Sequence, residues 1–143
     1  MIKKSFIFFL LFSFCSIYGQ KPPYALCNHM YKPDQLTSSA QYAEGPDEMY
    51  HFIYKNLSWK CGEKSLEGTV ILDFIVDRVG KIWDIKIQQS ISPCLDDEVI
   101  RAVKLMPSWV PAIINGSYVC SEVFLPVRFR LGWEEQYQRK KDK

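Results

Sequence analysis

A proline inside the longest strand pattern limits the kinds of sheet that this sequence can build. From Tyr118 to Leu131 apolar and polar side chains alternate with a period of two, which predicts a β-strand. Pro126 stands in the middle of that run, and because proline has no N–H it is tolerated only at a sheet edge or at a bulge. We therefore expect an edge strand with the Pro126 nitrogen turned to the open side. Phe124 and Arg128 are expected to point their backbone groups the same way.

An antiparallel hairpin is predicted before this strand. Residues 69–77 alternate with a period of two, Asp77-Arg78-Val79-Gly80 is typical of a turn, and residues 82–88 return. We expect one face of the return strand to carry Trp83, Ile85 and Ile87. The opposite face of the sheet is apolar enough that the first helix or a partner must cover it, since it is expected to carry Ile71, Ile75, Ile82 and Phe124.

Two amphipathic helices flank the hairpin. The first is predicted over 46–57, with a proline at its first position and acidic residues in its first turn. The second is predicted over 93–106, capped by Ser92 and with Asp97 paired to Arg101 on its outer face. The fold class that follows is α+β, a small antiparallel three-stranded sheet packed against two helices in the order α-β-β-α-β.

The chain divides into four predicted segments. Residues 1–19 combine a basic head with a short apolar run, which predicts a cleaved secretory signal peptide, and the alternative is an uncleaved membrane anchor. Residues 20–44 show no clean period and are predicted to form a linker or extended arm. Residues 45–131 form the folded domain, and residues 132–143 a polar tail.

Export would place the remaining cysteines in an oxidising compartment. Four cysteines outside the signal segment allow two disulfides in three connectivities, which the sequence does not separate: Cys27, Cys61, Cys94 and Cys120. The alternative is a metal site at Cys27 and His29. Because no second closely spaced pair of ligands accompanies these two residues, we expect no metal.

Charge and motifs exclude several functions. The chain has 18 Lys and Arg against 16 Asp and Glu, and the excess of two lies in the signal segment as Lys3 and Lys4. A neutral body does not fit nucleic-acid binding, which depends on cations that neutralise phosphates. The sequence has no phosphate-binding glycine loop, nucleophile elbow or paired metal ligands at helical spacing. We expect neither an enzyme nor a cofactor.

Several short motifs resemble the carboxy-terminal domain of TonB, the periplasmic energy-transducing protein of Gram-negative bacteria. The resemblance covers roughly 45–131 and is closest to the stand-alone versions found in Bacteroidetes-type bacteria. It rests on Leu66-Glu67-Gly68-Thr69-Val70, Phe74-Ile75-Val76-Asp77 with Gly80-Lys81-Ile82, Leu95-Asp96 with Ala102-Val103-Lys104, Met106-Pro107-Ser108-Trp109-Val110-Pro111, and Leu125-Pro126-Val127-Arg128-Phe129.

The resemblance implies a protein-binding role in transmembrane transport. In that family the domain binds an extended peptide of an outer-membrane receptor as an added strand beside its last strand. By position the docking edge would be Val119, Cys120, Ser121, Glu122, Val123, Phe124, Leu125, Pro126 and Val127, with Trp59 in a flanking loop. The alternative is a structural module that forms a homodimer, or an edge covered by residues 20–44. The expected location is the periplasm, with the membrane as partner only if the signal segment is uncleaved.

Overall fold

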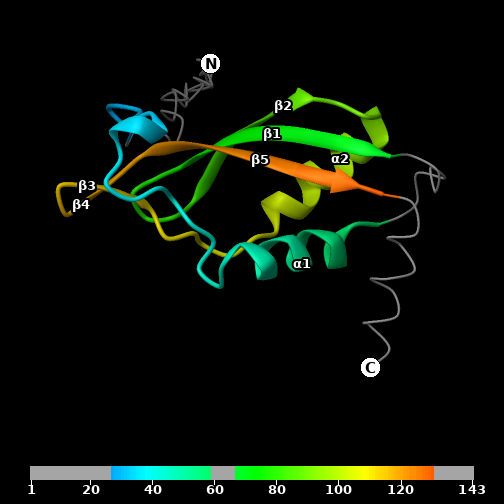
Figure 1. Ribbon diagram of the computed structural model, residues 1–143, viewed down its shortest axis with the longest axis horizontal. Coiled ribbons are helices and arrows are strands. Elements are labelled where there is room, and N and C mark those ends of the chain that lie inside the picture. The colour runs from blue at the N-terminus through cyan, green and yellow to red at the C-terminus, as the bar shows by residue number, and fades with distance from the viewer. Residues whose placement is uncertain (1–26, 59–66, 131–143) are drawn as a thin grey trace, which may run out of the picture.

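The computed structural model describes residues 27–58 and 67–130 (Figure 1). Its sheet has three antiparallel strands in the order β2-β1-β5, and α1 and α2 cover one face of that sheet, which confirms the predicted α+β class. In chain order the elements are η2 (Pro33–Gln35), α1 (Pro46–Asn56), β1 (Gly68–Val76), β2 (Ile82–Gln89), α2 (Pro93–Lys104), β3 (Ala112–Ile114), β4 (Ser117–Val119) and β5 (Ser121–Phe129).

The central strand, β1, carries the core. It pairs with β5 without interruption from Gly68 opposite Phe129 to Val76 opposite Ser121. The side chains of β1 that face the helices are fully buried: Val70, Leu72, Phe74 and Val76. Because β1 has neighbours on both sides, β5 lies at the edge of the sheet, as Pro126 predicts.

The last strand pattern is shorter than predicted from the sequence. The run that begins at Tyr118 breaks at Cys120 into β4 and β5, and β4 turns back to pair with β3 instead of β1. Asn115 and Gly116 make this possible, because both adopt positive φ, at 48° and 78°, in the tight turn between β3 and β4. Leu131, the predicted end of the strand, lies outside the described residues.

A bulge in β2 changes which side chains face the core. Asp84 has a φ of 52°, and the pairing with β1 shifts there. Ile82 and Ile85 both pack against the core, although they are three residues apart. The predicted alternation is therefore wrong at Ile82 and Trp83. Trp83 instead donates its indole N–H to the Oδ2 of Asp77 at 2.7 Å.

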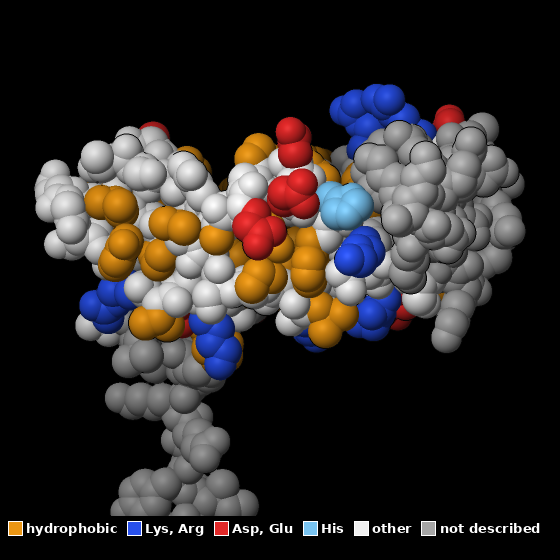
Figure 2. Space-filling view, turned by 90° about the horizontal axis from the view of Figure 1, so that it is seen from below, with side chains coloured by type: hydrophobic (Ala, Val, Ile, Leu, Met, Phe, Trp, Pro, Cys, Tyr) orange, Lys and Arg blue, Asp and Glu red, His pale blue; other side chains and the backbone are white. Residues whose placement is uncertain are grey.

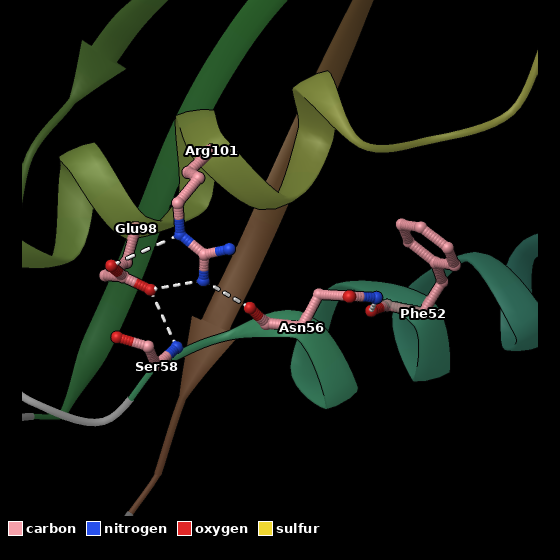
Figure 3. Close-up of polar contacts among 5 residues, drawn as sticks. All are labelled: Phe52, Asn56, Ser58, Glu98 and Arg101. Atoms are coloured by element: carbon pink, nitrogen blue, oxygen red, sulfur yellow. Dashed lines mark hydrogen bonds and ion pairs between the residues drawn. The ribbon is translucent and has the colours of Figure 1, made fainter.

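A polar cluster joins the two helices where α1 ends (Figure 3). Glu98 of α2 accepts from the backbone N–H of Ser58 at 2.7 Å and from the guanidinium of Arg101 at 2.7 Å. The same guanidinium donates to the carbonyl oxygen of Asn56. The predicted pairing of Arg101 with Asp97 is therefore wrong. Arg101 pairs with Glu98, which is the acid that also faces α1. The predicted cap of α2 is confirmed, since the hydroxyl of Ser92 accepts from the N–H of Leu95 at 3.3 Å.

The described part of the predicted arm lies against the domain. Cys27 forms a disulfide with Cys120. Further along, Tyr31 forms a parallel bridge with the first residue of β5. Two antiparallel bridges then join the arm to the chain segment that contains β3. One pairs Ser38 with Ile113, and the other pairs Gln41 with Val110. From residue 27 onward this segment is thus part of the folded structure rather than a free spacer.

Candidate functional site

The open side of β5 is marked by three hydrogen bonds to backbone carbonyls, one just before the strand and two within it. The N–H of Tyr31 donates to Cys120 at 3.3 Å. The hydroxyl of Tyr50 donates to Pro126 at 3.1 Å, and that of Tyr54 to Arg128 at 2.8 Å. All three acceptors are even-numbered, so the even-numbered residues of β5 turn their backbone groups away from β1. This is the direction that Pro126 predicts.

The matching of α1 to β5 follows from helix and strand geometry. Tyr50 and Tyr54 are one turn apart, a rise of roughly 6 Å. Pro126 and Arg128 are two strand residues apart, a rise of roughly 6.6 Å. The two hydroxyls therefore reach two successive outward carbonyls, and α1 runs in the same direction as β5.

Phe124 lies between these occupied positions. Its N–H and C=O share the outward direction by the two-residue alternation. Among residues 27–58 and 67–130 no hydrogen bond to these two groups is found on that side. The side chain of Phe124 is also 55% exposed. The open segment of the edge is therefore short, with Glu122 and Phe124 as its outward residues between Cys120 and Pro126.

An apolar groove with a volume of 460 Å³ adjoins the open segment. We call it the edge groove. One wall comes from β5, the other from the end of the arm and the start of α1, and Trp109 is a buried side chain of its lining. Its principal lining residues are Tyr42, Pro46, Met49, Tyr50, Trp109 and Val123–Pro126. This arrangement places an apolar pocket directly beside unpaired backbone groups.

Charge is distributed unevenly along the edge groove. Burial raises the pKa of Tyr42, and the nearby carboxylates of Glu44 and Glu48 raise it further. Burial also raises the pKa of Tyr50, where the guanidinium of Arg128 acts in the opposite direction. The carboxylates of Glu44 and Glu48 therefore act on the Tyr42 end of the groove, and the guanidinium of Arg128 acts near Tyr50. Figure 2 shows acidic side chains next to hydrophobic ones on the face that carries α1.

The structure separates the predicted edge residues into three groups. Val119 ends β4, and Cys120 connects β4 to β5 and is bonded to Cys27. Seven of the predicted residues lie in β5: Ser121, Glu122, Val123, Phe124, Leu125, Pro126 and Val127. Trp59, predicted in the flanking loop, lies outside the described residues.

The cysteine pairing is partly resolved. Besides the Cys27–Cys120 bond, Cys94 is also in a disulfide. Of the three connectivities that four cysteines allow, only the one that joins Cys61 to Cys94 is compatible with the first bond. Cys61 lies outside the described residues, so this second pairing stays a prediction.

Over residues 27–58 and 67–130, no group of His, Cys, Asp and Glu side chains could hold a metal ion. Within the same ranges, no helix has both the length and the apolar character needed to cross a membrane.

The tyrosines and the second wall of the edge groove were not predicted from the sequence. Tyr50 and Tyr54 stand at helical i, i+4 spacing, which marks them as one face of α1. That spacing was the available signal. It does not reveal their acceptors, which are 76 and 74 residues away along the chain.

Residues 62–131 match the family model described as the C-terminal region of the Gram-negative bacterial TonB protein. None of the curated proteins matches the chain. The matched residues include the whole three-stranded sheet and α2, whereas the arm and α1 precede them.

Proposed function

Residues 62–131 form a domain of the TonB C-terminal family, and from this premise we propose that the chain binds an extended peptide of an outer-membrane receptor by adding it as a strand beside β5. The family is one of periplasmic, non-enzymatic protein-interaction domains that act in transport. Strand addition suits an edge whose backbone N–H and C=O groups are unpaired, because those groups supply affinity while neighbouring pockets select the side chains.

The observation that carries this proposal is the outward backbone of Phe124 beside the edge groove. A peptide strand placed there would form a pair of hydrogen bonds with the N–H and C=O of Phe124. One of its side chains would then enter the groove. Apolar lining and unpaired backbone groups occur together at this place on the edge.

The occupied positions limit how far a peptide strand extends along β5. Tyr31 covers the start of the strand, and the hydroxyls of Tyr50 and Tyr54 hold its later outward carbonyls. Pro126 has no N–H to offer. A peptide that pairs beyond Phe124 towards Arg128 must therefore displace a tyrosine hydroxyl. Since each net hydrogen bond contributes about 0.5–1.5 kcal/mol, the backbone alone gives weak binding.

Self-association through the same surface is the second candidate function. The face of the sheet opposite the helices carries Ile71 and Ile75, which are only half-buried, and Phe124 is exposed beside them. A second copy of the chain laid along β5 would cover these side chains. In that case the edge would be paired before any peptide arrives.

Amide NMR of the full chain separates the two candidates. Synthetic peptides from outer-membrane receptors are titrated into the isotope-labelled protein. We expect saturable shifts at the amide of Phe124 and none at Val79, a matched apolar control that is 74% exposed on the β1–β2 turn. Shifts at Phe124 that follow protein concentration and ignore the peptides would instead indicate self-association and contradict the proposal.

A further inference from the structure

We propose that the edge groove selects an extended segment that places a large apolar side chain in the groove and a lysine or arginine at its Tyr42 end. The inference rests on the proposed function and specifies the chemistry of the partner. It follows from three features of the site: the short open edge, the apolar lining and the unequal charge of the two ends.

The short edge requires that side chains supply much of the affinity. Between Cys120 and Pro126 the open outward backbone groups are those of Glu122 and Phe124, because Tyr31, Tyr50 and Tyr54 occupy the positions on either side. A ladder this short cannot discriminate between sequences, since every peptide offers the same backbone. Selection therefore falls to the side chain that enters the groove.

The size and lining of the edge groove fit an apolar side chain. Its 460 Å³ lies in the lower part of the range of about 300–1,000 Å³ that ligand pockets have. Met49 and Leu125 line it and are themselves buried. Burying one leucine-sized side chain contributes about 1.5–3 kcal/mol, which exceeds the contribution of one backbone hydrogen bond.

The acidic end determines the charge of the neighbouring residue. Glu44, Asp47 and Glu48 are exposed at the start of α1, and in the described part of the chain no cation pairs with them. Asp47 and Glu48 also complement the helix dipole. Glu44 lies just before the N-cap residue Gly45. A partner cation at this end meets three carboxylates, while an acidic residue would be repelled.

The opposite end disfavours a cation. Arg128 is close enough to Tyr50 for its guanidinium to act on the phenol of that residue. A basic side chain there would face a like charge. The segment is thus oriented, with its basic residue towards Tyr42 and away from Arg128.

This selectivity belongs to the part of the chain outside the family match. Glu44, Asp47, Glu48 and the wall formed by Tyr42–Tyr50 all precede residue 62, where the matched segment begins. β5 supplies the shared edge, and the preceding residues determine which side chains are accepted beside it.

Three blocked heptapeptides of serine and threonine test the inference on the full chain. The first contains one lysine and one leucine, the second has glutamate in place of the lysine, and the third has serine in place of the leucine. Calorimetric titration at low salt should show about tenfold tighter binding of the first peptide than of the second. The preference should fall to about twofold at half-molar salt, because screening weakens exposed pairs. Loss of the leucine should weaken binding at least about tenfold.

Matched variants show where the charge acts. The double variant Glu44→Gln with Glu48→Gln should bind the lysine and glutamate peptides within about twofold of each other. The control variant Asp34→Asn with Asp97→Asn removes the same net charge from exposed residues that do not line the groove. It should keep the tenfold preference.

The outcomes separate this inference from the proposed function. If the lysine and glutamate peptides bind equally while receptor peptides still shift the amide of Phe124, the inference is wrong and strand addition stands. If neither these peptides nor the receptor peptides bind, both are wrong. An equal loss of preference in the two double variants would indicate a net-charge effect and would also contradict the inference.

Discussion

Gly80 and Trp109 are in direct backbone contact. The N–H of Trp109 donates to the carbonyl oxygen of Gly80 at 2.8 Å. A Cβ on residue 80 would lie 2.0 Å from the carbonyl oxygen of Trp109. This contact joins the β1–β2 turn to the segment after α2, and it requires a residue without a Cβ at position 80. It also holds Trp109 in the lining of the edge groove.

Replacing Gly80 with alanine should destabilise the fold strongly. Gly80 has a φ of +83°, so alanine there is strained as well as overlapping with backbone. We expect a loss of more than about 3 kcal/mol in the free energy of unfolding, measured by urea denaturation. The control is Gly116→Ala, where φ is +78° but nothing lies within 4 Å of the added Cβ. That variant should lose only about 1 kcal/mol, and equal losses would show that the contact with Trp109 is unimportant.

The hydroxyl of Tyr54 should contribute more to stability than that of Tyr50. Tyr54 is 3% exposed, and its bond to Arg128 is partly buried, whereas the Tyr50–Pro126 bond is exposed. Tyr54→Phe leaves a carbonyl without its partner and should lower the free energy of unfolding by about 1 kcal/mol. Tyr50→Phe should change it by less than half of that. The opposite order in urea denaturation would mean that α1 is held to β5 mainly through Tyr50.

The Cys27–Cys120 disulfide should stabilise the native state substantially. The two cysteines are 93 residues apart, so the bond restricts a long loop in the unfolded chain. Replacing both with alanine should lower the free energy of unfolding by up to about 4 kcal/mol. Amide hydrogen exchange should also quicken at Tyr31, whose N–H bonds to Cys120. Unchanged exchange at Tyr31 would show that the arm stays in place without the covalent bond.

Peptide mapping under non-reducing conditions should find a second linked pair, Cys61 with Cys94. The Cys27–Cys120 bond excludes the other two connectivities of these four residues. A proteolytic fragment that joins Cys61 to Cys27 or to Cys120 would contradict this. Reduction should separate both linked pairs of fragments.

Stability should fall in acid partly through Glu98. The hydrogen bond from Arg101 lowers the pKa of Glu98 from 4.5, and the N–H of Ser58 adds to this effect. Because the folded-state pKa lies below the unfolded one, the contribution is complete above the ordinary carboxyl range and is lost as the pH falls through the lowered value. Glu98→Gln should therefore be less stable than the parent at pH 7, with a smaller gap near about pH 3. A gap that stays constant between these pH values would exclude the linkage.

The structural features that could be predicted from the sequence are those whose physical cause lies within a few residues of the feature. Pro126 placed β5 at the sheet edge, because a missing N–H acts wherever the residue stands. The start and cap of α2 were equally local, since Ser92 and Pro93 act within one turn.

Other features depend on contacts between distant parts of the chain. The bulge at Asp84 shifts the register of β2 without any glycine or proline to mark it. The break at Cys120 separates β4 from β5 inside an unbroken period-two pattern. The edge groove needs α1 beside β5, and the bonds that place it there join residues more than 70 positions apart. Local pattern carries no information about these partners.

The covalent link between Cys27 and Cys120 has a mechanical consequence. Tension applied to the chain before residue 27 would be transmitted through the disulfide to Cys120, the residue that precedes β5. The arm would not first have to separate from β3. The load would then act along the length of β5, where the nine-residue register with β1 resists it in shear rather than opening one hydrogen bond at a time. Such a link lets the strand beside the edge groove hold its shape while the chain is pulled.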